Sequence, residues 1–205
     1  MSARLDPASG RRSRLTPERE GEIYAAVVQS LREVGYEALS MQEVAVRAKC
    51  STATLYRKWQ GKPALVVAAL RHQQPHPDAD PEIDTGSLRG DLHALADRLA
   101  SIAPTEHELM AAMAHAALGQ PELARIMREQ LADPAEGVLD RALHRAMDRG
   151  EISSRTPGHA FSYHLMFAVA LARPMMEGCQ ADEEYLKSFV DAVLLPALEH
   201  PAPLS

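Results

Sequence analysis

The side chains of this chain best suited to chemistry lie in the fifteen residues 48–62, AKCSTATLYRKWQGK. This stretch holds no Asp or Glu, and its four cations are Lys49, Arg57, Lys58 and Lys62. Small hydroxyl residues stand among the cations, together with one Leu, one Tyr and one Trp. Positive side chains and hydroxyl donors are the groups that bind the phosphate oxygens of nucleic acids. The stretch is therefore a candidate nucleic-acid contact.

The charge of the whole chain is divided unevenly. The chain has 205 residues and a formal net charge of −6. Residues 1–75 carry 12 Lys or Arg against 7 Asp or Glu, whereas residues 76–205 carry 10 against 21. A basic front on an acidic body predicts that only the front meets a polyanion, because the body is repelled by phosphate.

The composition is that of an ordinary globular protein, with 46% hydrophobic and 24% charged residues. No run of about 18 apolar residues is present, and the basic N-terminal residues lack the apolar segment of a secretory signal. The two cysteines, Cys50 and Cys179, lie far apart in sequence, which favours free thiols in a reducing compartment. We therefore expect a cytoplasmic protein without a membrane partner.

The periodicity of the apolar residues predicts an all-α fold of about nine helices, because no stretch alternates for long with the period of two that strands require. Thr16-Pro17 and the capping box Ser40-Met41-Gln42-Glu43 mark two helix starts, and Gly35 marks a helix end. Asp133-Pro134-Ala135-Glu136 offers a cap, a proline at the first helical position and an acid at the third, so a new helix or a sharp kink is expected to begin there. The apolar stripe of the first helix is expected to comprise Ile23, Val27, Leu31 and Val34.

Changes in composition divide the chain into four parts. Residues 1–15 are a basic arm, and residues 16–74 hold four short helices. Residues 75–86, PHPDADPEIDTG, contain three prolines and four acids, so they are expected to be a linker rather than a helix. Residues 87–205 form a second helical domain.

Residues 40–59 have the layout of a helix-turn-helix: a capped helix, a turn at Lys49-Cys50, and a second helix at 52–59 that Ser51 caps. The major groove of DNA admits one helix while the preceding helix braces it across the backbone. Leu55 and Trp59 lie four residues apart, so both can anchor the second helix inward. The residues between them are then free to face DNA.

The segment LREVGYEALSMQEVAVRAKCSTATLYRKWQGKPALVVAAL resembles the DNA-binding domain of the tetracycline-repressor (TetR) family of bacterial transcription regulators over about residues 16–72. The resemblance is carried by Gly35-Tyr36, Ser40, Val44-Ala45, Ala48, Ser51, Thr54-Leu55-Tyr56-Arg57, Trp59, Lys62 and Leu65. Two positions depart from the family's pattern. Lys49 stands where the turn usually has glycine, and Cys50 stands where a small aliphatic residue usually follows. A left-handed non-glycine residue costs roughly 1 kcal/mol.

The resemblance implies DNA contacts at nine positions: Gln42, Ser51, Thr52, Ala53, Thr54, Tyr56, Arg57, Lys58 and Lys62. Among these, Tyr56 and Lys62 would hold phosphates, and Gln42 would reach the edge of the groove. Thr52, Ala53, Thr54 and Lys58 would face bases, whereas Arg57 would serve either purpose. The arm residues Arg11, Arg12 and Arg14 either reach the neighbouring DNA backbone or minor groove or remain solvated surface charges.

The resemblance also implies a C-terminal domain that holds a ligand pocket and dimerises through its last two helices. A single recognition helix gives little specificity, so two-fold dimers that read two half-sites are the norm. An intramolecular core would account for part of the same apolar stripe. The expected interface residues are Phe161, Leu165, Ala168, Ala172, Phe189, Val193 and Ala197.

The candidate pocket is rich in methionine, which suits irregular cavities. Its residues are Met110, Met113, Met127, Met147, Phe161, His164 and Phe167, and the alternative is that these methionines fill the core. His115, His144 and His164 show no spacing that brings two of them together as metal ligands. We therefore expect neither a metal nor a cofactor.

The function predicted is that of a homodimeric transcriptional regulator, most simply a repressor. It would bind a palindromic double-stranded operator and be released by a small-molecule effector. The alternatives are a ligand sensor of the same fold with weak or lost DNA binding, and an activator. An enzyme is disfavoured because the chain has no G-x-S-x-G, H-E-x-x-H, P-loop or glycine-rich dinucleotide motif.

Overall fold

The computed structural model describes residues 15–73, 83–102, 104–152 and 157–199, and every regular element in these ranges is helical. The elements are α1 (Pro17–Ala38), α2 (Met41–Arg47), α3 (Thr52–Lys58), α4 (Lys62–Gln73), α5 (Leu88–Ala100), α6 (Pro104–Gly119), α7 (Pro121–Met127), the π-helical turn η1 (Arg128–Ala132), α8 (Asp133–Asp148), α9 (Pro157–Glu177), α10 (Glu183–Phe189), the π-helical turn η2 (Val190–Leu194) and α11 (Leu195–Glu199). Since α7–η1–α8 and α10–η2–α11 are continuous, the described residues form nine helical rods. The all-α prediction is confirmed.

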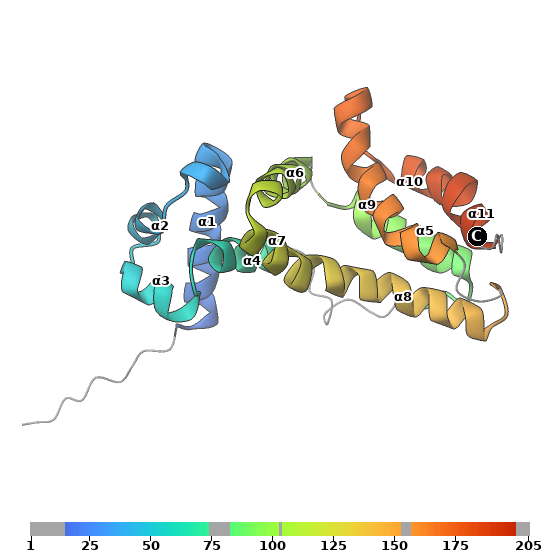
Figure 1. Ribbon diagram of the computed structural model, residues 1–205, viewed down its shortest axis with the longest axis horizontal. Helices are drawn as coiled ribbons and strands as arrows, with labels where there is room; N and C mark the ends of the chain where they lie inside the picture. Colours follow the sequence, from blue (N-terminus) through green and yellow to red (C-terminus); the bar gives the residue numbers. More distant parts are fainter. Residues whose placement is uncertain (1–14, 74–82, 103, 153–156, 200–205) are drawn as a thin grey trace, which may run out of the picture.

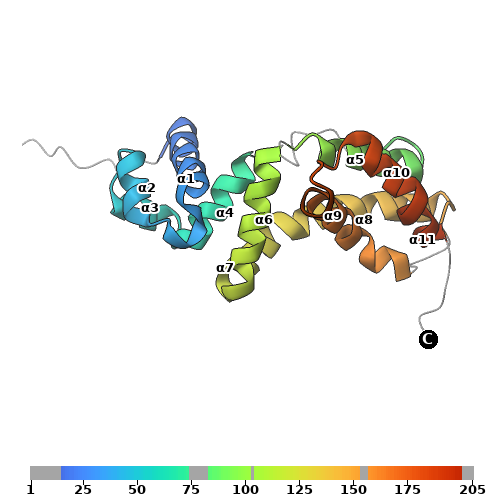
Figure 2. The same ribbon diagram turned by 90° about the horizontal axis from the view of Figure 1, so that it is seen from above.

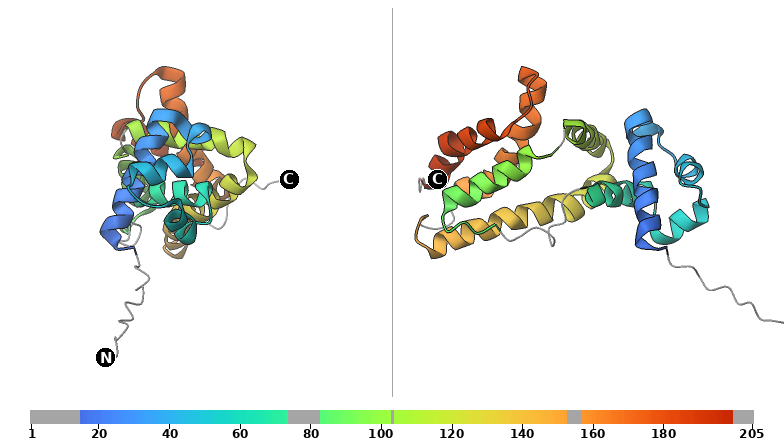
Figure 3. Two further views of the ribbon diagram at one scale, coloured as in Figure 1. Left: turned by 90° about the vertical axis from the view of Figure 1, so that its left-hand side faces the viewer. Right: turned by 180° about the vertical axis from the view of Figure 1, so that it is seen from behind.

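The molecule is elongated, with α1–α4 at one end and α5, α9, α10 and α11 at the other (Figures 1 and 2). The helices α6 and α7 lie between these groups, and α8 runs from the middle of the molecule to its far end (Figure 3, right). The predicted arm, apart from Leu15, and the predicted linker before residue 83 lie outside the described residues.

The expected helix caps of the N-terminal part are present. Thr16 Oγ1 accepts from the backbone N–H of Arg19 at 3.3 Å. In the capping box, Ser40 Oγ accepts from Glu43 N at 3.2 Å, and the Glu43 carboxylate accepts from Ser40 N at 3.2 Å. Gly35 takes φ 75° and interrupts α1, which makes one more turn before it ends at Ala38. These local signals fix the starts of α1 and α2 and the break in α1.

Two hydrophobic cores hold the molecule together. The first lies among α1–α4, and it also contains Leu109 and Met113 from α6 and Leu123 and Ile126 from α7. The second joins α5, α8, α9, α10, η2 and α11. The helices α6 and α7, which the sequence assigns to the second domain, therefore pack into the core of the first.

The rod α7–η1–α8 connects the two cores. The helix α8 begins at Asp133, as expected, but the expected capping role of Asp133 is wrong, because its φ of −59° and ψ of −42° are helical and α8 continues the rod. Pro134 has no N–H, so an ordinary i→i−4 bond is missing just there. The π-helical turn η1 ends at Ala132, two residues before Pro134, and η2 ends at Leu194, two residues before Pro196. Both rods thus accommodate a proline without a break in the helical backbone.

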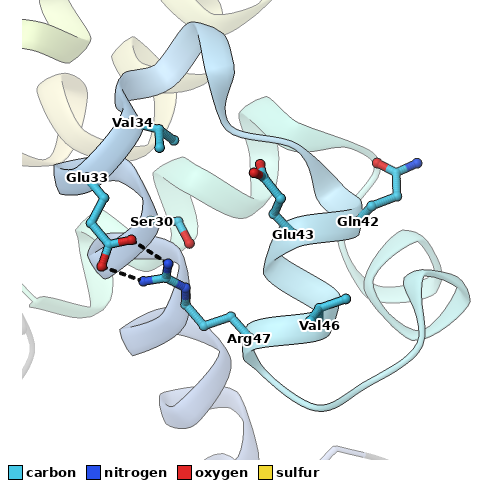
Figure 4. A pocket seen from close by; sticks show the side chains of 7 residues that line it. All are labelled: Ser30, Glu33, Val34, Gln42, Glu43, Val46 and Arg47. Atoms are coloured by element: carbon cyan, nitrogen blue, oxygen red, sulfur yellow. Dashed lines mark hydrogen bonds and ion pairs between the residues drawn. The ribbon is translucent and has the colours of Figure 1, made fainter.

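The apolar stripe of α1 is shorter than expected. Ile23, Val27 and Leu31 are buried, but the side chain of Val34 is 47% exposed. Val34 borders an open groove between α1 and α2, where no helix covers it (Figure 4). Among the described helices, none combines the length and the apolar character that crossing a membrane requires.

Candidate nucleic-acid interface

The helix α3 is fixed to the first core by the two residues expected to anchor it. Leu55 is fully buried and Trp59 is 6% exposed. The Trp59 ring meets Tyr24 of α1 edge to face, with 5.6 Å between ring centres. Because one face of α3 is held in this way, the opposite face is turned to solvent.

The outward face of α3 carries Ala53, Tyr56 and Arg57, which follow the i, i+3, i+4 spacing of one helix side and are all exposed. The Tyr56 side chain is 53% exposed, although large aromatic residues are usually buried. This face contains no carboxylate. It offers a methyl group, a phenol and a guanidinium, which are groups able to contact bases and phosphates.

The first turn of α3 is held by its own hydroxyl residues. Ser51 Oγ accepts from Thr54 N at 3.1 Å and lies 2.9 Å from Thr54 Oγ1. Thr52 and Thr54 are half-buried and Ser51 is exposed. The expected capping role of Ser51 is therefore confirmed, and the hydroxyl of Thr54 is already engaged by that cap.

Lys62, at the first position of α4, is held in a fixed place. Its Nζ donates to the carbonyl of Glu37 at 3.1 Å and lies 4.4 Å from the centre of the Tyr36 ring. Burial raises the pKa of Tyr36 to about 12, so this ring remains a neutral phenol near pH 7. A preordered ammonium loses little side-chain freedom when it meets a phosphate.

Lys58 is placed differently from the expectation that it faces bases. Its ammonium pairs with the carboxylate of Glu20 on α1 and lies 5.5 Å from the centre of the Trp59 ring. The side chain therefore bends back toward the body of its own domain. Arg57 lies with Ala53 and Tyr56 on the outward face, whereas Lys58, although exposed, is paired with Glu20.

The bracing helix α2 is tied to α1 by a bidentate ion pair between Arg47 and Glu33, whose Nη1–Oε1 distance is 2.9 Å (Figure 4). The hydrogen bond from Arg47 holds the pKa of Glu33 below its usual value. Beside this pair lies an open groove of about 480 Å³. It is lined by Ser30, Glu33, Val34, Gln42, Glu43, Val46 and Arg47. Gln42 is exposed and points away from α1 (Figure 4).

The turn between α2 and α3 is held from α1 as well. Lys49 stands where the family usually has glycine, and it takes φ 50°, the left-handed conformation expected of this turn position. Arg19 Nη2 donates to the carbonyl of Lys49 at 2.9 Å and also to the carbonyl of Ala48. Three residues of α1 thus bind the three parts of the helix-turn-helix: Glu33 binds α2, Arg19 binds the turn and Glu20 binds α3. The sequence analysis did not identify any of these three.

The seven residues of the candidate pocket fall into three groups. Met113 is buried in the first core and Met127 packs against it, whereas Met147 packs against the second core. Met110 on α6 is half-buried. On α9, Phe161 is 56% exposed, Phe167 is 38% exposed, and His164 is exposed. The pocket of these seven residues stays a prediction.

The candidate dimer residues lie along α9 and the rod α10–η2–α11. Phe161 and Val193 are 56% and 44% exposed, and Ala168 is exposed. The other four are half-buried, namely Leu165, Ala172, Phe189 and Ala197. Leu165 and Phe189 also pack against the second core, so the intramolecular alternative accounts for part of the stripe.

A helix-turn-helix with an acid-free outward face, carried on an all-helical body, defines a class of DNA-binding regulators. The family model described as "Bacterial regulatory proteins, tetR family" matches residues 23–69, and the model "Tetracyclin repressor-like, C-terminal domain" matches residues 82–193. The chain therefore belongs to the TetR family of bacterial transcriptional regulators.

Two curated relatives and one solved structure illustrate the similarity. The chain is 32% identical to the DNA-binding transcriptional repressor TetR of Mycobacteroides abscessus, over 86% of this chain and 92% of that protein. It is 29% identical to an uncharacterised HTH-type transcriptional regulator of Mycobacterium tuberculosis, over 88% of each chain. Salmonella enterica GusR shares the fold with a TM-score of 0.71 at 17% identity, over 92% of this chain and 100% of that one.

Proposed function

We propose that the protein is a homodimeric, ligand-responsive transcriptional repressor that acts in the cytoplasm on a palindromic DNA operator. The observation that carries this proposal is the outward face of α3, where Ala53, Tyr56 and Arg57 are exposed together. The buried anchors Leu55 and Trp59 present this face to solvent. The printed name of the M. abscessus relative, a DNA-binding transcriptional repressor, supports the same reading.

Dimerisation supplies the specificity that one short recognition helix lacks. Two copies joined about a two-fold axis read two half-sites, and their spacing is set by the dimer interface. Exposed apolar residues on α9 and η2, including Phe161 and Val193, make this surface the best candidate for that interface. The operator is accordingly expected to be a palindrome.

Effector control requires contacts that connect the C-terminal domain of each subunit to its DNA-binding domain, α1–α4. The helices α6 and α7 share the core of α1–α4, and Gln120 at their corner donates to the Glu37 carboxylate at 2.7 Å. The carbonyl of Glu37 in turn accepts from Lys62. A small molecule that binds better when α6 and α7 are displaced would therefore change the separation of the two DNA-binding domains of the dimer, away from the separation that fits DNA.

In vitro selection from a random DNA pool with the full-length protein tests this function. The expected product is a palindromic sequence, bound by a dimer with an affinity that falls steeply with salt. Tyr56→Ala and Lys62→Ala are expected to weaken binding to every sequence alike, because both contact phosphate. Thr54→Ala is expected to relax the preference at one position. Recovery of no preferred sequence would contradict the proposal.

A further inference from the structure

The turn between α2 and α3 combines a disfavoured backbone conformation with a side chain that binds it from outside. Lys49 has φ 50°, and it is the one non-glycine residue with positive φ in the part of the chain that the structure describes. Left-handed backbone costs an L-residue roughly 1 kcal/mol relative to glycine. Because this turn sets the angle between α2 and α3, whatever stabilises it also fixes how α3 meets DNA.

The guanidinium of Arg19 reaches two consecutive carbonyls of this turn, those of Ala48 and Lys49, and the second contact measures 2.9 Å. Ala48 is the C-cap of α2 and Lys49 follows it. The last carbonyls of a helix have no intrahelical donor, and they attract cations because the negative end of the helix dipole lies there. The backbone N–H groups of Lys49 and Cys50 already donate to the carbonyls of Val46 and Ala45, at 3.1 and 2.9 Å. Arg19 adds from α1 a donor for the two carbonyls that follow, those of Ala48 and Lys49.

The position of Arg19 is itself well determined. Its backbone N–H takes part in the N-terminal cap of α1, where it donates to Thr16 Oγ1 at 3.3 Å. Its Nη1 pairs with Glu22 one turn further along α1. The residue is thus held at its backbone N–H and at Nη1, while Nη2 donates to both carbonyls. A planar guanidinium engages Glu22 and the two carbonyls together in one fixed geometry, which the single ammonium group of a lysine does not reproduce.

We propose that Arg19 is a positioning residue for DNA recognition: it caps the end of α2, holds the left-handed turn at Lys49, and so sets the orientation of α3. Arg19 acts through the turn and makes no contact with DNA. The inference rests on the proposed DNA-reading role of α3. The proposal implies that the effects of Arg19 and Lys49 on operator binding are coupled, because Arg19 is needed only while a lysine occupies the left-handed position of the turn.

The coupling can be measured by fluorescence anisotropy on the selected operator duplex and on a scrambled duplex of the same length. Arg19→Ala is expected to weaken operator binding about tenfold, or ~1.4 kcal/mol. Binding to the scrambled duplex is expected to change by less than about twofold, with an unaltered salt slope, because no phosphate contact is lost. In a Lys49→Gly background the same Arg19→Ala change is expected to cost operator binding about twofold or less, because glycine adopts the turn unaided.

The charge-matched control is Arg19→Lys. It keeps the positive charge but loses the planar guanidinium that reaches Glu22 and the turn together, so it is expected to restore only part of the operator affinity. An equal loss on both duplexes, with a salt slope lower by about 0.9, would show that Arg19 binds phosphate, and it would overturn the proposal. An undiminished effect of Arg19→Ala in the Lys49→Gly background would overturn it as well.

Cys50 gives a readout of the turn that does not depend on DNA. Its thiol is half-buried beside the turn, and burial raises its pKa, whereas Cys179 is exposed. Iodoacetamide labelling of Cys50 in Arg19→Ala is expected to accelerate severalfold relative to Cys179, as the turn opens. Loss of the nearby guanidinium alone would slow it, since that charge favours the thiolate.

The labelling experiment also separates the two proposals. If selection yields no preferred duplex while Arg19→Ala accelerates Cys50 labelling and Lys49→Gly cancels that effect, the turn is held as described and the proposed regulator function fails. If the operator is found but Cys50 labelling is no faster in Arg19→Ala than in wild type, the positioning role of Arg19 is overturned. Circular dichroism of the variant that combines Arg19→Ala with Lys49→Gly checks that the DNA-binding domain is folded, and its spectrum is expected to match that of the wild type.

Discussion

The ammonium of Lys58 on α3 is paired with the carboxylate of Glu20 on α1. This carboxylate lies on the side of α3 that faces α1, away from Ala53, Tyr56 and Arg57. The side chain of Glu20 is 23% exposed and that of Lys58 is 37% exposed, so this pair is partly shielded from solvent. A paired lysine contributes little to phosphate binding until its partner releases it. We therefore expect this pair to limit the electrostatic affinity of the α1–α4 domain for DNA of any sequence.

Glu20→Gln is expected to strengthen binding to scrambled DNA by a few-fold and to steepen the slope of log affinity against log salt by about 0.9, because one more cation becomes available to phosphate. Anisotropy titrations across a series of salt concentrations measure both quantities. The matched control is Glu184→Gln, which makes the same change of net charge on α10. An unchanged slope in Glu20→Gln would mean that freeing Lys58 adds no phosphate contact.

The contrast between Leu55 and Lys58 shows which parts of the interface can be predicted from sequence. The burial of Leu55 and Trp59 follows from their i, i+4 spacing within one helix, and the cap at Ser51 follows from a neighbouring residue type. The pairing of Lys58 with Glu20 spans 38 residues, and no local pattern encodes such a contact. The exposure of Ala53, Tyr56 and Arg57 was therefore predictable, but the pairing of Lys58 with Glu20 was not.

The two rods show a similar limit for the fold. A proline such as Pro134 is normally read as a helix start or a kink. The π-helical turn that precedes it lets the chain continue, so the rod from α7 to α8 stays unbroken. The packing of α6 and α7 into the first core was also not predicted, because apolar spacing identifies a buried face but not the helices that cover it.

Ser40→Ala is expected to lower the free energy of unfolding by about 1 kcal/mol, because it removes one half of the capping box of α2. Urea denaturation followed by circular dichroism, at one fixed protein concentration, measures this loss. Ser188 lies in the interior of α10 and caps no helix, so Ser188→Ala serves as the control and is expected to change stability by less than about 0.5 kcal/mol. Equal effects of the two changes would show that the cap contributes nothing specific.

Val193→Glu is expected to convert the proposed dimer to a monomer and to abolish operator binding. Val193 lies on η2 and is 44% exposed in the single chain, so a carboxylate there is tolerated by the monomer but not in an apolar interface. Light scattering coupled to size-exclusion chromatography measures the mass. The control is Met176→Glu, which adds the same charge at an 82% exposed position near the end of α9. A Val193→Glu protein that stays dimeric would place the interface elsewhere.

The last prediction concerns Asp191, whose side chain joins η2 to α5 within the second core. Its carboxylate accepts from Arg89 Nε at 2.8 Å and Nη2 at 2.7 Å, and it lies 2.9 Å from His93 Nε2. The hydrogen bonds from Arg89, supported by His93, hold the pKa of Asp191 well below its usual value. A lowered pKa in the folded state means that the ionised carboxylate stabilises the fold above the pKa of about 3.9 in the unfolded chain, and that this contribution is lost as the pH falls below it.

Asp191→Asn is therefore expected to lower the free energy of unfolding at pH 7 by up to about 1 kcal/mol, a limit set by the partial exposure of the pair to solvent. The difference from wild type is expected to shrink at pH 3, because the wild-type carboxylate is then losing its charge-dependent advantage. Urea denaturation at the two pH values measures this change. Asp148→Asn, at an exposed acid at the end of α8, is the control, and it is expected to leave stability at both pH values nearly unchanged. A deficit in Asp191→Asn of equal size at pH 3 and pH 7 would show that packing, rather than the charge on Asp191, joins η2 to α5.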